Sequence, residues 1–215
     1  VLFILAAFVM LNLHSGSMNF ADFAAYAHQG DKFASLIFML AFIGFGIKAG
    51  FVPFHNWLPD AHPAAPSHVS AVMSGVMIKT GLYGILRVLF MLGTPTKSVA
   101  YTVFVIALVT ALYGILYALA QRDLKKLLAY SSIENIGIIG LGIGLGMIGL
   151  AYENPLVAML GFAGGILHIL NHSIFKELMF FGAGSVYNRT HTRDMEVLGG
   201  LIKKMPKTAF LFIIG

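Results

Sequence analysis

The sequence contains no cysteine, and only 11% of its 215 residues are charged. Without cysteine the chain can form no disulfide, no thiolate zinc site and no cysteine-ligated iron–sulfur cluster, and its redox compartment stays open. The shortage of charge is more informative, because a soluble domain carries roughly 25% charged residues. With 58% hydrophobic residues and a mean hydropathy of +0.84, the chain is predicted to lie in a membrane.

The chain also lacks an initiator Met and the basic n-region of a signal peptide, since it begins with VLFILAAFVM. It ends with AFLFIIG, inside a new apolar stretch. We therefore expect residues 1–215 to form one transmembrane domain that is a fragment of a larger fold. No internal repeat or low-complexity segment interrupts this domain.

Apolar runs of about 20 residues predict an all-α, polytopic bundle, because that length of helix crosses the hydrocarbon core. Strands are excluded by the length of the runs, and an open sheet edge would leave backbone groups unpaired in lipid. A polar link is expected between the first two helices, from His14 to Lys32. The expected helices cover residues 1–13, about 33 onward with an interruption near 48–53, 67–92, 98–120, 124–150, 155–187, and from about 207.

Three of the links between these helices are expected on one side of the membrane, and together they carry eight basic residues. The three links span 58–66, 121–126 and 188–207, and their eight basic residues are Arg122, Lys125, Lys126, Arg189, Arg193, Lys203, Lys204 and Lys207. The opposite side has Lys32 and Lys97, with Arg87 near a helix end. Since cytoplasmic loops are rich in Lys and Arg, the three links are predicted to face the cytoplasm. Membrane topology thus accounts for the net charge of +5, and nucleic-acid binding is not expected.

Four ionisable residues interrupt the apolar runs: Lys48, Lys79, Glu134 and Lys176. A cation at mid-bilayer costs roughly 2.5–3.5 kcal/mol on insertion scales, so such residues usually serve a function. Snorkelling to the headgroups explains Arg87 and Lys126 but fails for Lys79, which is near the centre of its helix. Lysine also suits proton transfer, because burial and a nearby carboxylate can balance its two protonation states, whereas arginine stays protonated.

A second array is HILNHSIFK, in which His168, His172 and Lys176 are spaced i, i+4, i+8. This spacing places the three side chains on one helix face, about 6 Å apart per step. Such a column of titratable groups is a plausible route for protons. Zinc binding by the two histidines is the alternative, but the chain has no HExxH motif and no third ligand in step.

Two other patterns have simpler interpretations than binding sites. His55, Asp60, His62 and His68 match no standard metal-ligand spacing, so we interpret this stretch as a helix end near the cytoplasmic face with Trp57 as an interfacial anchor. The G-x-G-x-x-G match at residues 144–149 lies late in an apolar run. Because a dinucleotide site needs this motif between a strand and a helix, close helix packing is the expected role of its glycines.

Three separated segments resemble a known family. These are KAGFVPFHNWLPDAHPAAPSHVSAVMSGVMIKTGLYGILR, RDLKKLLAYSSIENIGIIGLGIG and HILNHSIFKELMFFGAGSVYNRTHTRDMEVLGGL. They are similar to the Mrp-antiporter-like proton-channel subunits, which include the antiporter-like subunits of respiratory complex I and of membrane-bound hydrogenases. The Ile-Glu-Asn after Tyr-Ser-Ser and the His-Thr-Arg-Asp-Met-Glu tail look most like the hydrogenase-4 component B and formate-hydrogenlyase branch.

The resemblance implies a proton-translocating subunit without a catalytic centre, cofactor or metal of its own. Lys48 matches the lysine beside an interrupted helix, and Lys79 matches the bridging lysine on the next helix. The column at residues 168–176 matches the polar array before a second interrupted helix. A glutamate that pairs with Lys48 would lie upstream and the exit residue beyond Gly215, while the role of Glu134 stays open.

The resemblance also implies partners and a location: other membrane and peripheral subunits of a redox complex in a bacterial or archaeal cytoplasmic membrane, with H⁺, or Na⁺, as the transported ion. The electron donor, whether hydrogen, formate, NADH or ferredoxin, stays open. An Mrp-type Na⁺/H⁺ antiporter subunit and an NADH-quinone oxidoreductase subunit are the alternatives. A quinone-handling or peptide-cleaving membrane enzyme lacks motif support, and a purely structural subunit conflicts with the four intramembrane charges.

Overall fold

The computed structural model describes residues 1–27 and 33–215, and this part of the chain is helical, with no β-strand. Lys32, which the sequence placed on the less basic side, lies outside the described residues. The helices are α1 (Leu2–Ser15), α2 (Phe20–Ala27), α3 (Ala34–Ala49), α4 (Trp57–Ala64), α5 (Ser67–Val72), the π-helical turn η1 (Met73–Met77), α6 (Ile78–Leu92), α7 (Lys97–Leu119), α8 (Leu124–Ala151), α9 (Pro155–Thr190), α10 (Leu201–Lys204) and α11 (Pro206–Ile214).

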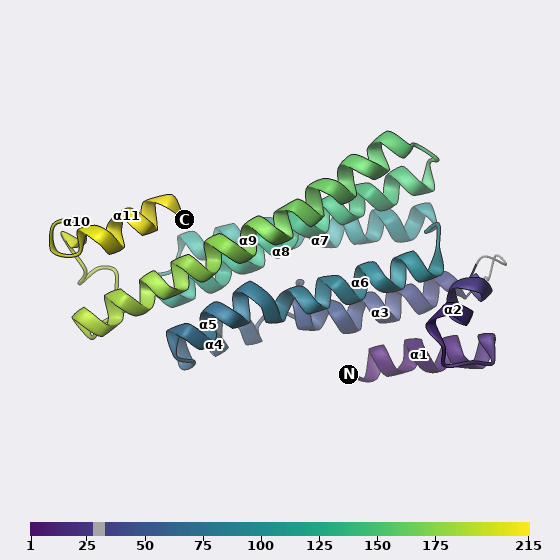
Figure 1. The fold of residues 1–215 in the computed structure, drawn as a ribbon, viewed down its shortest axis with the longest axis horizontal. Helices are drawn as coiled ribbons and strands as arrows, with labels where there is room; N and C mark the ends of the chain where they lie inside the picture. Colours follow the sequence, from purple (N-terminus) through teal and green to yellow (C-terminus); the bar gives the residue numbers. More distant parts are fainter. Residues whose placement is uncertain (28–32) are drawn as a thin grey trace.

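The long helices run side by side along the long axis of the molecule (Figure 1). Helix α8 packs between α7 and α9, while α3 packs against both α1 and α6. In the described part, four helices are long and apolar enough to cross a membrane: 67–92, 97–119, 124–151 and 155–190. They match four predicted spans closely, and the predicted all-α transmembrane bundle is confirmed.

The predicted interruption near Lys48 is also present. Helix α3 ends at Ala49, where Gly50 takes a left-handed conformation with φ of 96° and donates its N–H to Gly46 O at 2.8 Å. After a turn, the chain resumes as α4, and the indole of Trp57 donates to Ile47 O at 3.0 Å. This bond satisfies one of the carbonyls that the end of α3 leaves unpaired. Trp57 thus holds the two halves of the interrupted helix together, and its role as an interfacial anchor stays a prediction.

Two segments expected to be links form short helices. Most of the 58–66 link is helical as α4, because Pro59 lies in its first turn, where a missing N–H costs no hydrogen bond. The polar link from residue 14 contains α2, whose Phe20 and Phe23 rings lie 6.1 and 6.3 Å from the ring of Phe8 in α1. Aromatic packing on α1 therefore holds this short helix in place.

Glycines bring α7, α8 and α9 into close contact, as the sequence predicted. A Cβ added to Gly144 would lie 2.8 Å from Phe104 Cα, and one added to Gly149 would overlap the backbone nitrogen of Ala158. Both glycines belong to the G-x-G-x-x-G match, which lies within the continuous helix α8. The motif therefore serves helix packing.

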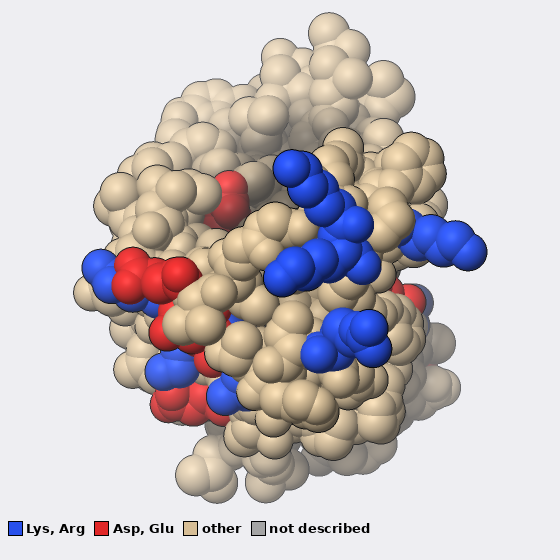
Figure 2. Space-filling model, turned by 90° about the vertical axis from the view of Figure 1, so that its left-hand side faces the viewer, with Lys and Arg blue, Asp and Glu red and all other residues tan. Residues whose placement is uncertain are grey.

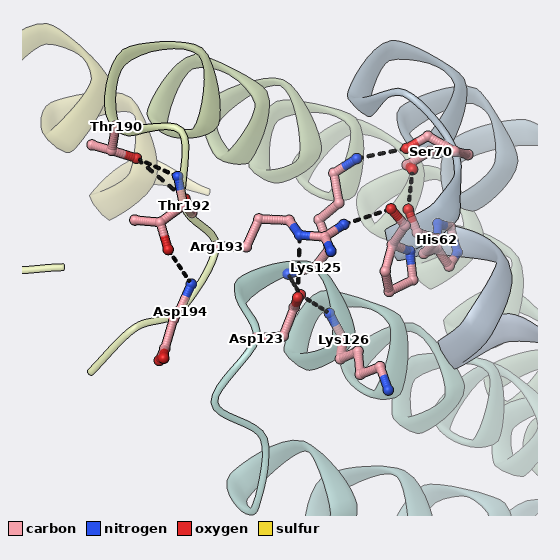
Figure 3. A network of polar contacts seen from close by, with 11 residues as sticks. His62, Ser70, Asp123, Lys125, Lys126, Thr190, Thr192, Arg193 and Asp194 are labelled. Carbon is pink, nitrogen blue, oxygen red and sulfur yellow. Dashed lines mark hydrogen bonds and ion pairs between the residues drawn. The ribbon is translucent and has the colours of Figure 1, made fainter. Parts of the chain in front are cut away.

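The basic links meet at one end of the bundle. Figure 2 shows Lys and Arg side chains gathered on this end, with acidic side chains among them. Arg193 joins the three links, since its Nε lies 3.2 Å from Asp123 Oδ2 and its Nη1 donates to Pro63 O at 2.5 Å (Figure 3). Lys125 adds a bond from Nζ to Ala65 O at 2.7 Å. The prediction that the links share one end is confirmed, and their cytoplasmic orientation stays a prediction.

Candidate proton-transfer site

Lys79 lies at the centre of the candidate site. Its side chain enters the bundle from the first turn of α6, and only 8% of the residue is exposed. The ammonium nitrogen lies 2.6 Å from His172 Nδ1 and also donates to the backbone oxygen of Ser74. Since an ammonium has no acceptor, His172 Nδ1 is the acceptor, and the proton of the neutral ring is on Nε2. Lys79 is therefore poised to pass a proton directly to a histidine on another helix.

The π-helical turn η1 makes the carbonyl of Ser74 available to Lys79. At its end the N–H of Ile78 bonds to Met73 O, five residues back, so it does not occupy Ser74 O. The hydroxyl of Ser74 lies 2.8 Å from the hydroxyl of Ser132, which fixes the turn against α8. Single π-helical turns within α-helices are frequent at functional sites. Hydropathy gave no sign of this turn.

The column on α9 has the predicted spacing. The rings of His168 and His172 are 6.3 Å apart, and His172 is fully buried. His168 Nε2 lies 2.9 Å from Oδ1 of Asn135, a buried side chain of α8. In the described part of the chain, His172 Nε2 is buried and has no hydrogen-bond partner. Sequence reasoning missed Asn135, although its position directly after Glu134 was a usable signal.

Lys176 continues the column one turn further along α9. It is 2% exposed, and its Nζ donates to Leu128 O at 3.4 Å. Glu134, half-buried on α8, interacts electrostatically with Lys176, but no direct ion pair joins them within the described ranges. The structure thus places Glu134 beside the row as a charge partner for Lys176. Whether Glu134 also carries protons stays a prediction.

Lys48, like Glu134, lies outside the row formed by Lys79, His168, His172 and Lys176. It lies in the last turn of α3 and its side chain is exposed. Its helix end nevertheless reaches the row, because a Cβ on Gly81 of α6 would lie 2.6 Å from Phe45 O and 2.9 Å from Ala49 N. The backbone around Lys48 therefore packs one half-turn from Lys79. Its role in proton transfer stays a prediction.

Two more buried histidines lie outside the column on α9, although His62 interacts electrostatically with Lys176 and Lys79. His55 packs against Tyr113 of α7, with ring centroids 4.5 Å apart, and His62 stacks on Phe180 of α9 at 4.7 Å. Asp60 and His68, in contrast, are exposed. Over residues 1–27 and 33–215, no three His, Asp or Glu side chains gather as a metal site would require.

The arrangement supports proton transfer between buried neutral and charged bases. A proton on Lys79 can pass along the 2.6 Å contact to His172 Nδ1, after which the Nε2–H of the charged ring is the next donor. Along α9, Lys176 and His168 are the titratable groups one helical turn from His172 on either side. These buried ionisable groups, in a helical bundle with an interrupted membrane helix, define an antiporter-like membrane subunit.

The chain belongs to the NADH:quinone oxidoreductase/Mrp antiporter transmembrane family, whose sequence pattern matches residues 1–215. It is 49% identical over 215 residues to hydrogenase-4 component B of Escherichia coli, covering 99% of this chain and 32% of that protein. It is 45% identical over 179 residues to formate hydrogenlyase subunit 3 of Escherichia coli, covering 83% of this chain and 29% of that protein. The chain therefore spans about a third of the length of these relatives.

A solved structure of the Mrp complex from a Dietzia species contains a similar chain. The TM-score is 0.84 at 27% sequence identity, over 98% of this chain and 37% of the Dietzia chain. The family predicted from the sequence is confirmed.

Proposed function

We propose that this chain is part of the proton-translocating membrane subunit of a membrane-bound hydrogenase or related complex I-like redox complex. The observation that carries the proposal is the buried contact between Lys79 Nζ and His172 Nδ1, two titratable groups from different helices 2.6 Å apart. A merely structural bundle would have little use for this pair, because burying a charge is costly. The 49% identity to hydrogenase-4 component B supports the choice of complex.

In this proposal, electron transfer in partner subunits shifts charges along the row of ionisable groups. A proton enters from the cytoplasmic side and passes Lys48 and Lys79. It then crosses the column formed by His168, His172 and Lys176, and leaves on the outer side. Glu134 is the charge partner of Lys176 on α8. The redox centres belong to the partner subunits in this proposal, and the complex lies in the cytoplasmic membrane.

The test uses the full-length subunit in its parent complex, in inverted membrane vesicles. Electron transfer is driven chemically, and acidification of the lumen is followed with a pH-sensitive dye. Lys79→Met is expected to leave uncoupled electron flow intact and to abolish most acidification, because methionine has a similar shape but carries no proton. Lys48→Met in parallel tests whether the exposed lysine belongs to the same route. Unchanged acidification in Lys79→Met would contradict the proposal.

A second candidate is a subunit of a Mrp-type Na⁺/H⁺ antiporter, which the TM-score of 0.84 to the Dietzia Mrp chain favours. The two functions differ in what drives the proton. A redox-driven pump acidifies vesicles only during electron flow and without Na⁺. An antiporter moves protons in response to an imposed Na⁺ gradient with no electron donor present.

A further inference from the structure

Glu177 is an acidic residue of α9 outside the row of candidate residues described above. It follows Lys176 directly, yet the two side chains leave the helix in different directions: Lys176 reaches Leu128 O of α8, whereas Glu177 lies over Gly75 in the turn η1. The contact with Gly75 is close, since a Cβ added there would overlap Glu177 Oε1 and lie 2.6 Å from its Cδ. Any residue other than glycine at position 75 would have to displace the carboxylate.

The position of Glu177 brings its carboxylate near Lys79. Both side chains line the same open groove of about 610 Å³ between α6 and α9, together with Thr80 and Ser173. The carboxylate of Glu177 interacts electrostatically with the Lys79 ammonium. The other groups that face Lys79 are His172 and the carbonyl of Ser74, with Lys176, His168 and His62 at longer range. Glu177 is therefore the negative charge that faces Lys79 in the described part of the chain.

Lys79 and Lys176 thus have separate carboxylates on separate sides. Glu134 of α8 faces Lys176, and Glu177 of α9 faces Lys79. A buried ammonium surrounded by neutral groups and a second cation would lose its proton too readily to stay protonated between two transfer steps. A carboxylate a short distance away offsets this without forming the tight ion pair that would trap the proton.

We propose that Glu177 is the counter-charge that positions the proton on Lys79, and that Gly75 is the small residue that admits it. The inference rests on the proposed function, because it assigns a role within the same row. In the transfer step an N–H bond of Lys79 breaks and an N–H bond forms at His172 Nδ1. The lysine becomes a neutral amine, the imidazole becomes a cation, and Glu177 stays an anion throughout. A proton from the side of Lys48 then restores the ammonium.

The test compares four variants of the full-length subunit in its parent complex, scored as protons translocated per electron pair in inverted vesicles. Glu177→Gln keeps the shape and removes the charge, and it is expected to lower this ratio roughly tenfold, which corresponds to about 1.4 kcal/mol of charge interaction. Glu177→Asp keeps the charge and is expected to restore most of the ratio. Glu153→Gln, in the exposed link after α8, is the matched control and is expected to behave as wild type. Lys79→Met tests whether the row carries protons at all, and it is expected to abolish most proton translocation.

Gly75 supplies an independent arm of the same test. Gly75→Ala is expected to reproduce the loss seen in Glu177→Gln, because the added methyl group displaces the carboxylate. In the Glu177→Ala background, Gly75→Ala is expected to cause no further loss, since nothing is left to displace. Assembly of each variant into the complex is checked by the yield of the purified complex.

Each contrary result has a distinct meaning. A normal ratio in Glu177→Gln together with a loss in Lys79→Met overturns the role of Glu177 and leaves the proposed function intact. Equal loss in Glu177→Asp and Glu177→Gln, or an additive loss from Gly75→Ala in the Glu177→Ala background, also overturns it, since packing would then explain the effect. A normal ratio in Lys79→Met overturns the proposed function and the inference with it.

Discussion

Replacing His172 by phenylalanine is the most informative single change at the centre of the row. The ring keeps its place and approximate volume, but the acceptor that lies 2.6 Å from Lys79 Nζ disappears. A hydrogen bond to a charged group contributes about 1.5–3 kcal/mol. If proton transfer from Lys79 uses this bond, its barrier should rise by about that amount, which slows the step roughly 10- to 100-fold.

The assay for His172→Phe is the initial rate of dye-detected acidification in inverted vesicles, divided by the rate of electron transfer measured with an uncoupler present. His55→Phe is the matched control, because His55 is equally a buried histidine but packs against Tyr113 of α7, away from Lys79. The control is expected to retain the wild-type ratio. A wild-type ratio in His172→Phe, with the complex fully assembled, would refute the reasoning, because protons would then bypass the contact between Lys79 and His172.

Two further predictions concern the packing that holds the site in place, and both are measured by thermal unfolding of the detergent-solubilised complex. Trp57→Phe removes the hydrogen bond to Ile47 O and loosens the interrupted helix. We expect it to lower the free energy of unfolding by about 1 kcal/mol. An unchanged melting curve would show that water replaces the indole fully. Gly149→Val places a branched side chain against the backbone of Ala158. We expect it to lower the stability of the complex by about 1–3 kcal/mol or to block assembly. Normal stability would mean that α8 and α9 can separate freely.

The sequence predicted the membrane helices well because their signal is local. The spans at 67–92, 124–151 and 155–190 contain long apolar runs, and hydropathy alone identifies such runs. The interruption after Lys48 was equally visible, since Gly50 and Pro53 disfavour a continuous helix.

The features that were missed depend on contacts between distant residues. The π-helical turn η1 is fixed by a hydroxyl pair between Ser74 and Ser132 of another helix, and no local pattern announces it. Helix α2 forms within the stretch that was expected to be a polar link, because its aromatic side chains pack on α1. Short helices gain most of their stability from such tertiary packing, so sequence propensity describes them poorly.

The candidate site was predicted in part. The periodicity of residues 168–176 placed three titratable groups on one face, as the structure confirms. No spacing rule could join that face to Lys79, since the contact links positions 79 and 172 through the packing of α9 against η1. Glu177 was out of register with the column and was passed over, although it lies on the side of α9 that faces Gly75.

The most direct test of the central claim is the number of protons translocated per electron pair by the Lys79→Arg variant of the full-length subunit in its complex. Arginine keeps the positive charge and much of the length of lysine, but it does not release its proton. If Lys79 carries protons, the ratio should fall toward the value of Lys79→Met while electron transfer continues. If Lys79 is only a buried structural cation, Lys79→Arg should translocate protons as wild type does, and the account would be contradicted.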